Sequence, residues 1–161
     1  MMKPILFLVI IFLSSCSTTY YVVRHAEKEA ASQSMTSDVP LSAAGSERAG
    51  ALKSELQHKS IRHIYATNYI RTKETARPLG DAIGVAIETY DSKDTGFVNR
   101  LREIKKGNTL VVGHSNTVDD LVNGLTSKNL LRDLPDTQYG DLFVIRKKGK
   151  TYQYEVKHFG K

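Results

Sequence analysis

The chain has 161 residues, which is long enough for one domain with its own hydrophobic core. Charged residues make up 25% and hydrophobic residues 40%, as in an ordinary globular protein. The single cysteine excludes both an internal disulfide and a metal site built on thiolates. The net charge of +6 favours anionic ligands. The basic residues are spread along the chain, however, and do not indicate nucleic-acid binding.

The N-terminal residues have the features of an export signal. Lys3 precedes the apolar run 5–13, whose nine residues fall far short of the ~20 that a membrane-spanning helix needs. The stretch Leu13-Ser14-Ser15-Cys16 resembles the bacterial lipoprotein box, which implies cleavage before Cys16 and lipid on its sulfur and amine. We therefore expect residues 1–15 to be a lipoprotein signal peptide. Residues 16–161 would then be lipid-anchored in the bacterial cell envelope, at the outer membrane and facing the periplasm. The alternatives are an ordinary signal cut elsewhere and an uncleaved anchor.

Strand-like and helix-like segments alternate along most of the chain. Alternating or continuously apolar runs predict strands at 19–23, Ile61–Thr67, 85–90 and 109–113. Apolar residues at helical spacing predict helices over 42–58, 69–83, 97–104 and 118–125, the second of them kinked or restarted at Pro78. Two alternating runs around Lys148 and Gly149 predict a C-terminal β-hairpin.

This alternation predicts an α/β fold with three layers, α/β/α, a largely parallel sheet and the hairpin at its end. In such sheets ligands bind beyond the carboxyl ends of the strands. Arg24 and His25 directly follow the first strand, His114 follows the fourth, and Arg71 begins the helix after the second. We therefore expect these four side chains to converge. Guanidinium groups bind phosphate oxygens in bidentate fashion, and a neutral imidazole can attack phosphorus.

The same residues carry a resemblance to a known family. The stretch "VVRHAEK" resembles the RHG/RHA signature of the histidine phosphatase superfamily, whose fold is that of phosphoglycerate mutase. Three further stretches resemble the family's later motifs in order and spacing: "DVPLSAAGSERA" at 38–49, "IYATNYIRTKETARPL" at 64–79 and "LVVGHSNTV" at 110–118. The resemblance extends from Tyr20 to about Gly124, and the short chain resembles the bacterial phosphohistidine phosphatases.

The resemblance implies a role for each matching residue. His25 corresponds to the nucleophile that becomes phosphohistidine, and His114 to the second histidine, which contacts the transferring phosphoryl group. Arg24 and Arg71 correspond to the phosphate-binding arginines. Ser115 and Asn116 are weaker candidates for hydrogen bonds at the edge of the site. The resemblance further implies a phosphorylated small molecule or phosphoprotein as substrate, with no metal and no cofactor.

The acid that protonates the leaving group is not identified by these motifs. Asp91, beyond the third strand, is the favoured candidate, and Asp94 and Glu27 are alternatives, whereas Glu103 lies too close to the strand that leads to His114. If none of them reaches the site, the substrate needs a good leaving group, such as that of a phosphohistidine or a phosphoanhydride.

Two other functions remain open at this stage. A phosphate-binding envelope lipoprotein that has lost turnover would keep the same motifs, and the uncertain acid favours it. A mutase is the third possibility, although the short chain and the export signal argue against it. Because Cys16 lies only a few residues before the first strand, we also expect the site to open away from the membrane.

Overall fold

The structure, a computed structural model, describes residues 17–30 and 38–160. The expected signal peptide and lipidation site, residues 1–15 and Cys16, lie outside these residues. Within the described part of the chain, no helix is both long and apolar enough to cross a membrane.

Each strand and helix expected from the sequence is present. The strands are β1 (Ser17–Arg24), β2 (Ile61–Thr67), β3 (Ile87–Tyr90), β4 (Asn108–Gly113), β5 (Asp141–Lys148) and β6 (Thr151–His158). The helices are α1 (Ala43–Leu56), α2 (Ile70–Ile83), α3 (Phe97–Glu103) and α4 (Val118–Thr126). The α/β class and the C-terminal hairpin are confirmed. The expected restart at Pro78 is wrong, because α2 continues through that residue as one helix.

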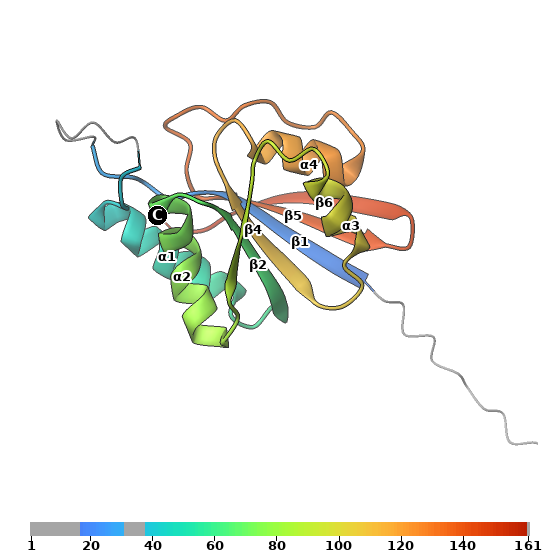
Figure 1. Cartoon of the computed structure of the whole chain (residues 1–161), viewed down its shortest axis with the longest axis horizontal. Coiled ribbons are helices and arrows are strands. Elements are labelled where there is room, and N and C mark those ends of the chain that lie inside the picture. The colour runs from blue at the N-terminus through green and yellow to red at the C-terminus, as the bar shows by residue number, and fades with distance from the viewer. Residues whose placement is uncertain (1–16, 31–37, 161) are drawn as a thin grey trace, which may run out of the picture.

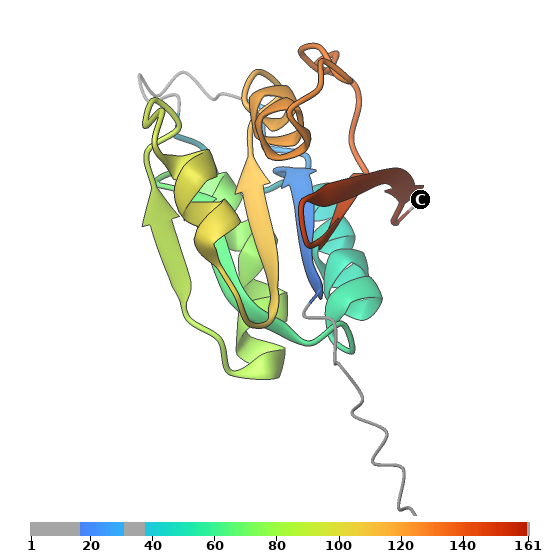
Figure 2. The ribbon, with the colours of Figure 1, turned by 90° about the vertical axis from the view of Figure 1, so that its right-hand side faces the viewer.

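The six strands form one sheet in the order β3-β2-β4-β1-β5-β6. The neighbouring pairs among β3, β2, β4 and β1 are parallel, whereas β5 and β6 are antiparallel to their neighbours. The arrowheads of β1, β3 and β4 therefore point to the same edge of the sheet, at the top of Figure 2. From β1 the chain continues toward β2, whereas from β4 it continues toward β5 on the other side. The strand order thus reverses between β1 and β4, which is where α/β sheets bind ligands.

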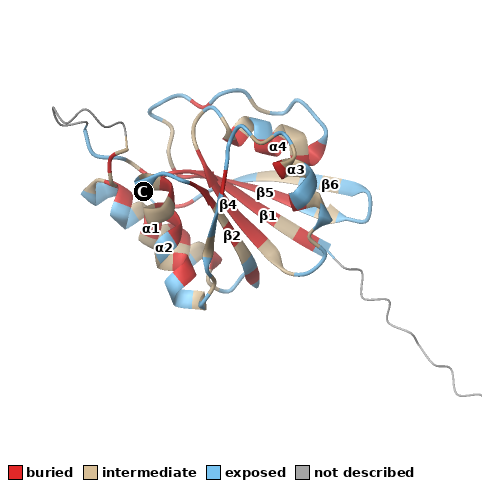
Figure 3. Cartoon of the chain, in the orientation of Figure 1, coloured by how far each residue is buried: buried red, intermediate tan, exposed pale blue. Residues whose placement is uncertain are grey.

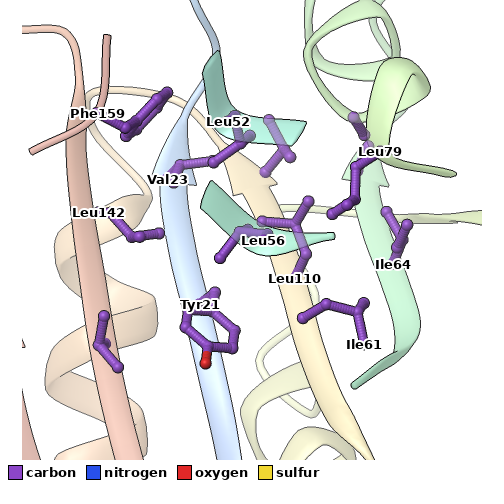
Figure 4. Packing of buried hydrophobic residues seen from close by; sticks show 14 residues of the cluster. Tyr21, Val23, Leu52, Leu56, Ile61, Ile64, Leu79, Leu110, Leu142 and Phe159 are labelled. Atoms are coloured by element: carbon purple, nitrogen blue, oxygen red, sulfur yellow. The ribbon is translucent and has the colours of Figure 1, made fainter. Parts of the chain in front are cut away.

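Two hydrophobic clusters hold a layer of helices against each face of the sheet (Figure 1). One cluster packs α1 and α2 on the strands through Leu52, Leu56, Leu79 and their neighbours, which cover Val23 of β1 and Leu110 of β4 (Figure 4). The other packs α3 and α4 on the opposite face. The central strands are almost continuously buried, whereas exposed residues lie on the outer sides of the helices, on β6 and on the loops (Figure 3). The packed strands therefore hold in fixed positions the residues at and beyond their carboxyl ends, among them Arg24, His25 and His114.

The start of α1 packs tightly on the segment that follows β1. Ser42 is the N-cap of α1, and its hydroxyl accepts a hydrogen bond from the Gly45 N–H. The Ser42 N–H donates to the carbonyl oxygen of Glu27 at 2.9 Å. A Cβ on Gly45 would lie 2.0 Å from that oxygen, so only glycine allows the helix to approach so closely. The segment just after the candidate nucleophile is held in this way by α1.

Candidate active site

His25 and His114 are neighbours because β1 and β4 are neighbours. Parallel pairing places Arg24 opposite Gly113 at the ends of β1 and β4. His25 directly follows Arg24 and His114 directly follows Gly113, so the two histidines also lie opposite each other. The His25 N–H donates to the Gly113 carbonyl oxygen at 2.9 Å, which continues the pairing by one residue. The ring centroids of the two imidazoles lie 5.4 Å apart, with the rings edge to face.

The hydrogen bonds of His25 determine which ring nitrogen can react. Nδ1 lies 2.8 Å from the carbonyl oxygen of Ala26. Since a carbonyl oxygen can only accept, Nδ1 carries the proton, and Nε2 keeps a free lone pair. The Ala26 N–H in turn donates to the Thr75 hydroxyl at 3.0 Å, and that hydroxyl donates to the Arg71 carbonyl at 2.7 Å. This chain of contacts from α2 holds Ala26, the residue whose carbonyl oxygen orients the imidazole.

The tautomer of His114 follows from the same reasoning. Nη2 of Arg71 lies 3.4 Å from Nδ1 of His114, and a guanidinium can only donate, so Nδ1 is the acceptor. In the neutral ring the proton is then on Nε2, which donates to the Thr67 hydroxyl at 2.8 Å. The Thr67 hydroxyl donates to that of Thr72 at 3.1 Å, and Thr72 donates to the backbone carbonyls of Thr67 and Tyr69. We call this chain, from His114 through Thr67 to Thr72, the threonine relay.

Arg71 is held at the N-terminal end of α2 by contacts on two sides. Its guanidinium lies over the ring of Tyr69, 4.5 Å from the ring centroid, and 3.8 Å from the Asp38 carboxylate. The same carboxylate accepts the Ile70 N–H at 2.8 Å. Tyr69 also packs edge to face on His114, with ring centroids 4.9 Å apart. The start of the helix therefore fixes both the arginine and one side of the histidine.

Arg24 is held by a segment more than a hundred residues further along the chain. Its Nη1 donates to the carbonyl oxygens of Pro135 and Gln138, at 2.8 and 3.1 Å. Its Nη2 lies 3.3 Å from the Tyr139 hydroxyl and 3.5 Å from the Asp136 carboxylate, and its guanidinium stacks 4.2 Å from the centroid of the Tyr139 ring. Arg24 is only 7% exposed, and its Nε has no hydrogen-bond partner among the described residues.

All four predicted site residues line one cavity of about 350 Å³. The other lining residues are Lys28, Tyr69, Ser92, Lys93, Ser115, Asn116, Thr117 and Asp136. Burial, together with the positive charges of Arg71 and Arg24, lowers the pKa of the His25 imidazole to about 3, although the hydrogen bond to Ala26 acts in the opposite direction. Burial, Arg71 and Arg24 likewise lower the pKa of His114 to about 4. Both imidazoles are therefore neutral at pH 7, and the positive charge in the cavity comes from arginine and lysine.

The structure does not bring Asp91 into this cavity. Asp91 is exposed, lines a neighbouring hollow, and its carboxylate accepts the Lys93 N–H at 2.9 Å within its own loop. Its role as the acid stays a prediction without support from this geometry. Asp94 is no better placed, because its carboxylate bonds the Arg100 guanidinium, and this hydrogen bond lowers the pKa of the carboxyl group. Glu103 is an exposed residue at the end of α3, outside the cavity lining.

Glu27 is occupied by an ion pair. Its carboxylate accepts from both Nε and Nη2 of Arg48, at distances from 2.6 to 2.9 Å. This hydrogen bonding lowers the pKa of Glu27, so the group is ionised at neutral pH and does not serve as a proton donor. Arg48 also donates to the Phe159 carbonyl at 3.1 Å, which ties the end of the chain to the segment after the nucleophile.

Sequence reasoning missed most of the side chains that orient the site. Tyr139 and Asp136 lie in a loop after α4 that has no periodic pattern. The threonine relay gave no signal of its own, although Thr67 and Thr72 lie within the motif around Arg71. The Ser115 and Asn116 candidates do line the cavity. Among residues 17–30 and 38–160, no group of three or more His, Cys, Asp or Glu side chains is arranged to hold a metal ion.

The family of the chain is shown by its sequence. Residues 20–108 match the Histidine phosphatase superfamily (branch 1), and the chain belongs to this family. No curated protein matches the chain.

Solved structures share the fold. A candidate phosphohistidine phosphatase SixA from Nakamurella multipartitia has 20% sequence identity and a TM-score of 0.68, over 90% of this chain and 98% of that one. The protein histidine phosphatase SixA complexed with tungstate has 15% identity and a TM-score of 0.69, over 87% and 96%. A mycobacterial glucosyl-3-phosphoglycerate phosphatase has 13% identity and a TM-score of 0.60, over 88% and 98%. At such low identities the likeness establishes the phosphoglycerate mutase-like fold and no particular substrate.

Proposed function

We propose that this protein is a phosphatase that hydrolyses a phosphomonoester or a similar phosphoryl compound through a phosphohistidine on His25. The observation that carries the proposal is the hydrogen bond from Nδ1 of His25 to the Ala26 carbonyl. It leaves Nε2 unprotonated in a cavity that two arginines share. The family and the phosphatases among its structural neighbours support the same activity.

The reaction proceeds in two displacements. The lone pair on Nε2 attacks phosphorus, the bond from phosphorus to the leaving group breaks, and the leaving group takes that electron pair. Water then attacks the phosphohistidine, the P–N bond breaks, and Nε2 recovers its lone pair as inorganic phosphate leaves. Arg24 and Arg71 neutralise the charge on the equatorial oxygens in both steps.

His114 is placed to act on the phosphoryl oxygens. A phosphoryl dianion in the cavity raises the pKa of a neighbouring imidazole, because the opposite charge favours the protonated form. Since Nδ1 accepts from Arg71, a proton on Nδ1 requires the Arg71 guanidinium to turn to the phosphoryl oxygens, while Nε2 stays on the threonine relay. His114 would then gain a second donor when the substrate is bound.

The choice of leaving group follows from the lining of the cavity. Among the described residues, Asp136 is the one carboxylate in that lining, and it lies 3.5 Å from Nη2 of Arg24, with which it forms an ion pair. We therefore favour substrates that need no strong acid, such as phosphohistidine, phosphoanhydrides or aryl phosphates. The same observation sustains the second candidate, a phosphate-binding lipoprotein without turnover.

Release of inorganic phosphate from a series of phosphoryl compounds separates the two candidates. We expect turnover of acyl, aryl and phosphoramidate substrates, with rates that fall steeply as the leaving group becomes more basic. His25→Ala should abolish turnover, and the control His58→Ala, at an exposed position outside the cavity, should keep it. Binding of phosphate without turnover of any compound would favour the binding protein. Transfer of the phosphoryl group to a second substrate hydroxyl instead of water would favour a mutase.

The placement of the protein at a membrane through lipid on Cys16 remains part of the proposal. The described chain begins at Ser17, at the start of β1, and His25 follows the other end of that strand. Eight strand residues at ~3.3 Å each span about 26 Å. An anchor at Cys16 would therefore leave the cavity at the far edge of the sheet. Cys16→Ala with a cleavable signal should give an unanchored enzyme with unchanged kinetics on a water-soluble substrate. Preference of the lipidated form for a phospholipid phosphate in vesicles would contradict this orientation.

A further inference from the structure

We propose that Lys28 and Lys93 form a second anion site at the mouth of the catalytic cavity, so that the preferred substrate carries an anionic group on its leaving group. This inference rests on the proposed phosphatase function and adds a substrate class to it: phosphoryl compounds with a carboxylate or a second phosphate close to the transferred phosphoryl group.

The first argument is the charge of the cavity. Its lining holds four cationic side chains, those of Arg24, Lys28, Arg71 and Lys93, against one carboxylate, that of Asp136. The two histidines add no charge near neutral pH, since both pKa values are lowered. The Asp38 carboxylate, 3.8 Å from Arg71, adds a second negative charge, so the net charge of these groups is 4 − 2 = +2, and each of the two carboxylates lies against one arginine. The unpaired positive charge is therefore on the two lysines, where it favours a further anionic group.

The second argument is the depth of the four cations. Arg24 is buried, and the Arg71 side chain is only 12% exposed, so both guanidinium groups lie in the wall near the histidines. Lys28 and Lys93 are exposed and line the same cavity from its outer part. A phosphoryl group bound by His25 and the arginines would therefore direct its leaving group outward, toward the lysines.

The third argument is that both lysines project from a fixed backbone. Lys28 pairs with Leu41 in a short antiparallel bridge. The Lys93 N–H donates to the Asp91 carboxylate, and the Asp94 N–H donates to the Asp91 carbonyl at 3.0 Å. In the part of the chain that the structure describes, neither ammonium group is in an ion pair. The backbone of both lysines is thus fixed, and no carboxylate forms an ion pair with either ammonium group among the described residues.

The topology places the two lysines on different sides of the opening. Lys28 follows β1 and Lys93 follows β3, and the strands β4 and β2 lie between these two in the sheet. Each lysine has a flexible four-carbon stem, so the two ammonium groups can converge on one anionic group at the mouth of a cavity of about 350 Å³. Asp91 and Asp94, the acids on the Lys93 loop, are not in the cavity lining.

A matched pair of ligands isolates the second charge. 4-Carboxyphenyl phosphonate and 4-carbamoylphenyl phosphonate have nearly the same shape, resist hydrolysis, and differ by one negative charge. We expect the wild-type protein to bind the carboxylate about tenfold more tightly in low salt, since two exposed cations face one anion. The preference should shrink in 0.5 M NaCl, because salt screens exposed charges. Lys28→Gln and Lys93→Gln should each reduce it, and the double variant should bring the ratio of dissociation constants close to one.

Lys128→Gln is the matched control, because it removes an equally exposed charge outside the cavity. It should keep the wild-type ratio. Equal binding of both phosphonates by the wild-type protein, or an unchanged ratio in the double variant, would overturn the inference. Because binding is measured without turnover, this result is independent of the proposed activity. The corresponding phosphates then test kcat/KM: turnover of both without preference contradicts only the second anion site, and binding preference without turnover contradicts only the phosphatase.

Discussion

Replacing Thr67 with valine removes one hydroxyl group and leaves the shape of the side chain nearly unchanged. This substitution therefore tests the threonine relay. Thr67 is only 2% exposed, and its hydroxyl accepts the Nε2–H of His114 at 2.8 Å. Leaving a buried donor without its acceptor costs about 1–3 kcal/mol. If that cost falls on the catalytic position of the imidazole, kcat/KM should drop by about 5- to 150-fold, since each 1.4 kcal/mol is a factor of ten. The melting temperature should fall by about 2–12 °C for the same cost in a chain of this size.

Thr109→Val provides the control. Thr109 is fully buried in β4, but its hydroxyl has no hydrogen-bond partner among the described residues, so the same substitution should leave both stability and kcat/KM intact or slightly improved. ¹⁵N chemical shifts of the histidine ring report the tautomer directly. We expect the Nε2-protonated form of His114 in the wild type and a mixture of tautomers in Thr67→Val. An unchanged tautomer together with kcat/KM within twofold of wild type would refute the reasoning.

Three further outcomes follow from the site. Arg71→Ala should lower kcat/KM by ~10²-fold or more with little change in melting temperature. The control Arg77→Ala, at an exposed position on the same helix, should lower neither quantity. Global unfolding of Arg71→Ala would contradict a role of Arg71 in binding the phosphoryl group. EDTA should not inhibit, because guanidinium groups neutralise the phosphoryl charge, and vanadate should inhibit as a mimic of pentacoordinate phosphorus; inhibition by EDTA that added metal reverses would count against this account. Because the pKa values of His25 and His114 are lowered to about 3 and about 4, the unfolded chain binds protons below pH 6.5 that the folded chain does not. Stability to urea should therefore be constant above pH 6.5 and fall progressively toward pH 3, more weakly in the double variant His25→Gln, His114→Gln; identical pH curves for both proteins would show that the histidines are not the cause.

The fold and the core of the site were predictable because they depend on regular patterns. Helical spacing and strand alternation fixed the order of the elements, since each buries one apolar face. The rule that ligands bind beyond strand ends then placed His25 and His114 together, and the structure confirms their proximity. Arg71 was predictable for the same reason, because the helix that begins at Ile70 directly follows β2.

The side chains that orient the site were not predictable, because they lie in irregular segments. Arg24 is held by Asp136 and Tyr139, from a loop whose conformation follows no period in the sequence. Asp91 was expected near the site because it follows a strand, but its loop turns so that its carboxylate bonds the loop backbone. Glu27 lies two residues after the nucleophile and was a reasonable acid until its ion pair with Arg48 was known. Such contacts depend on backbone paths that local sequence does not determine.

The most direct test of the central claim is to trap the phosphorylated enzyme and locate the phosphoryl group. Rapid acid-free quenching of the wild-type protein during turnover of an aryl phosphate should yield an acid-labile, base-stable adduct on His25. Because Nδ1 donates to the Ala26 carbonyl, the phosphoryl group should be on Nε2, which phosphorus–nitrogen NMR coupling identifies. His25→Ala should lose both the adduct and the release of phosphate. Full turnover by His25→Ala, or an adduct on Nδ1 or on another residue, would contradict the account.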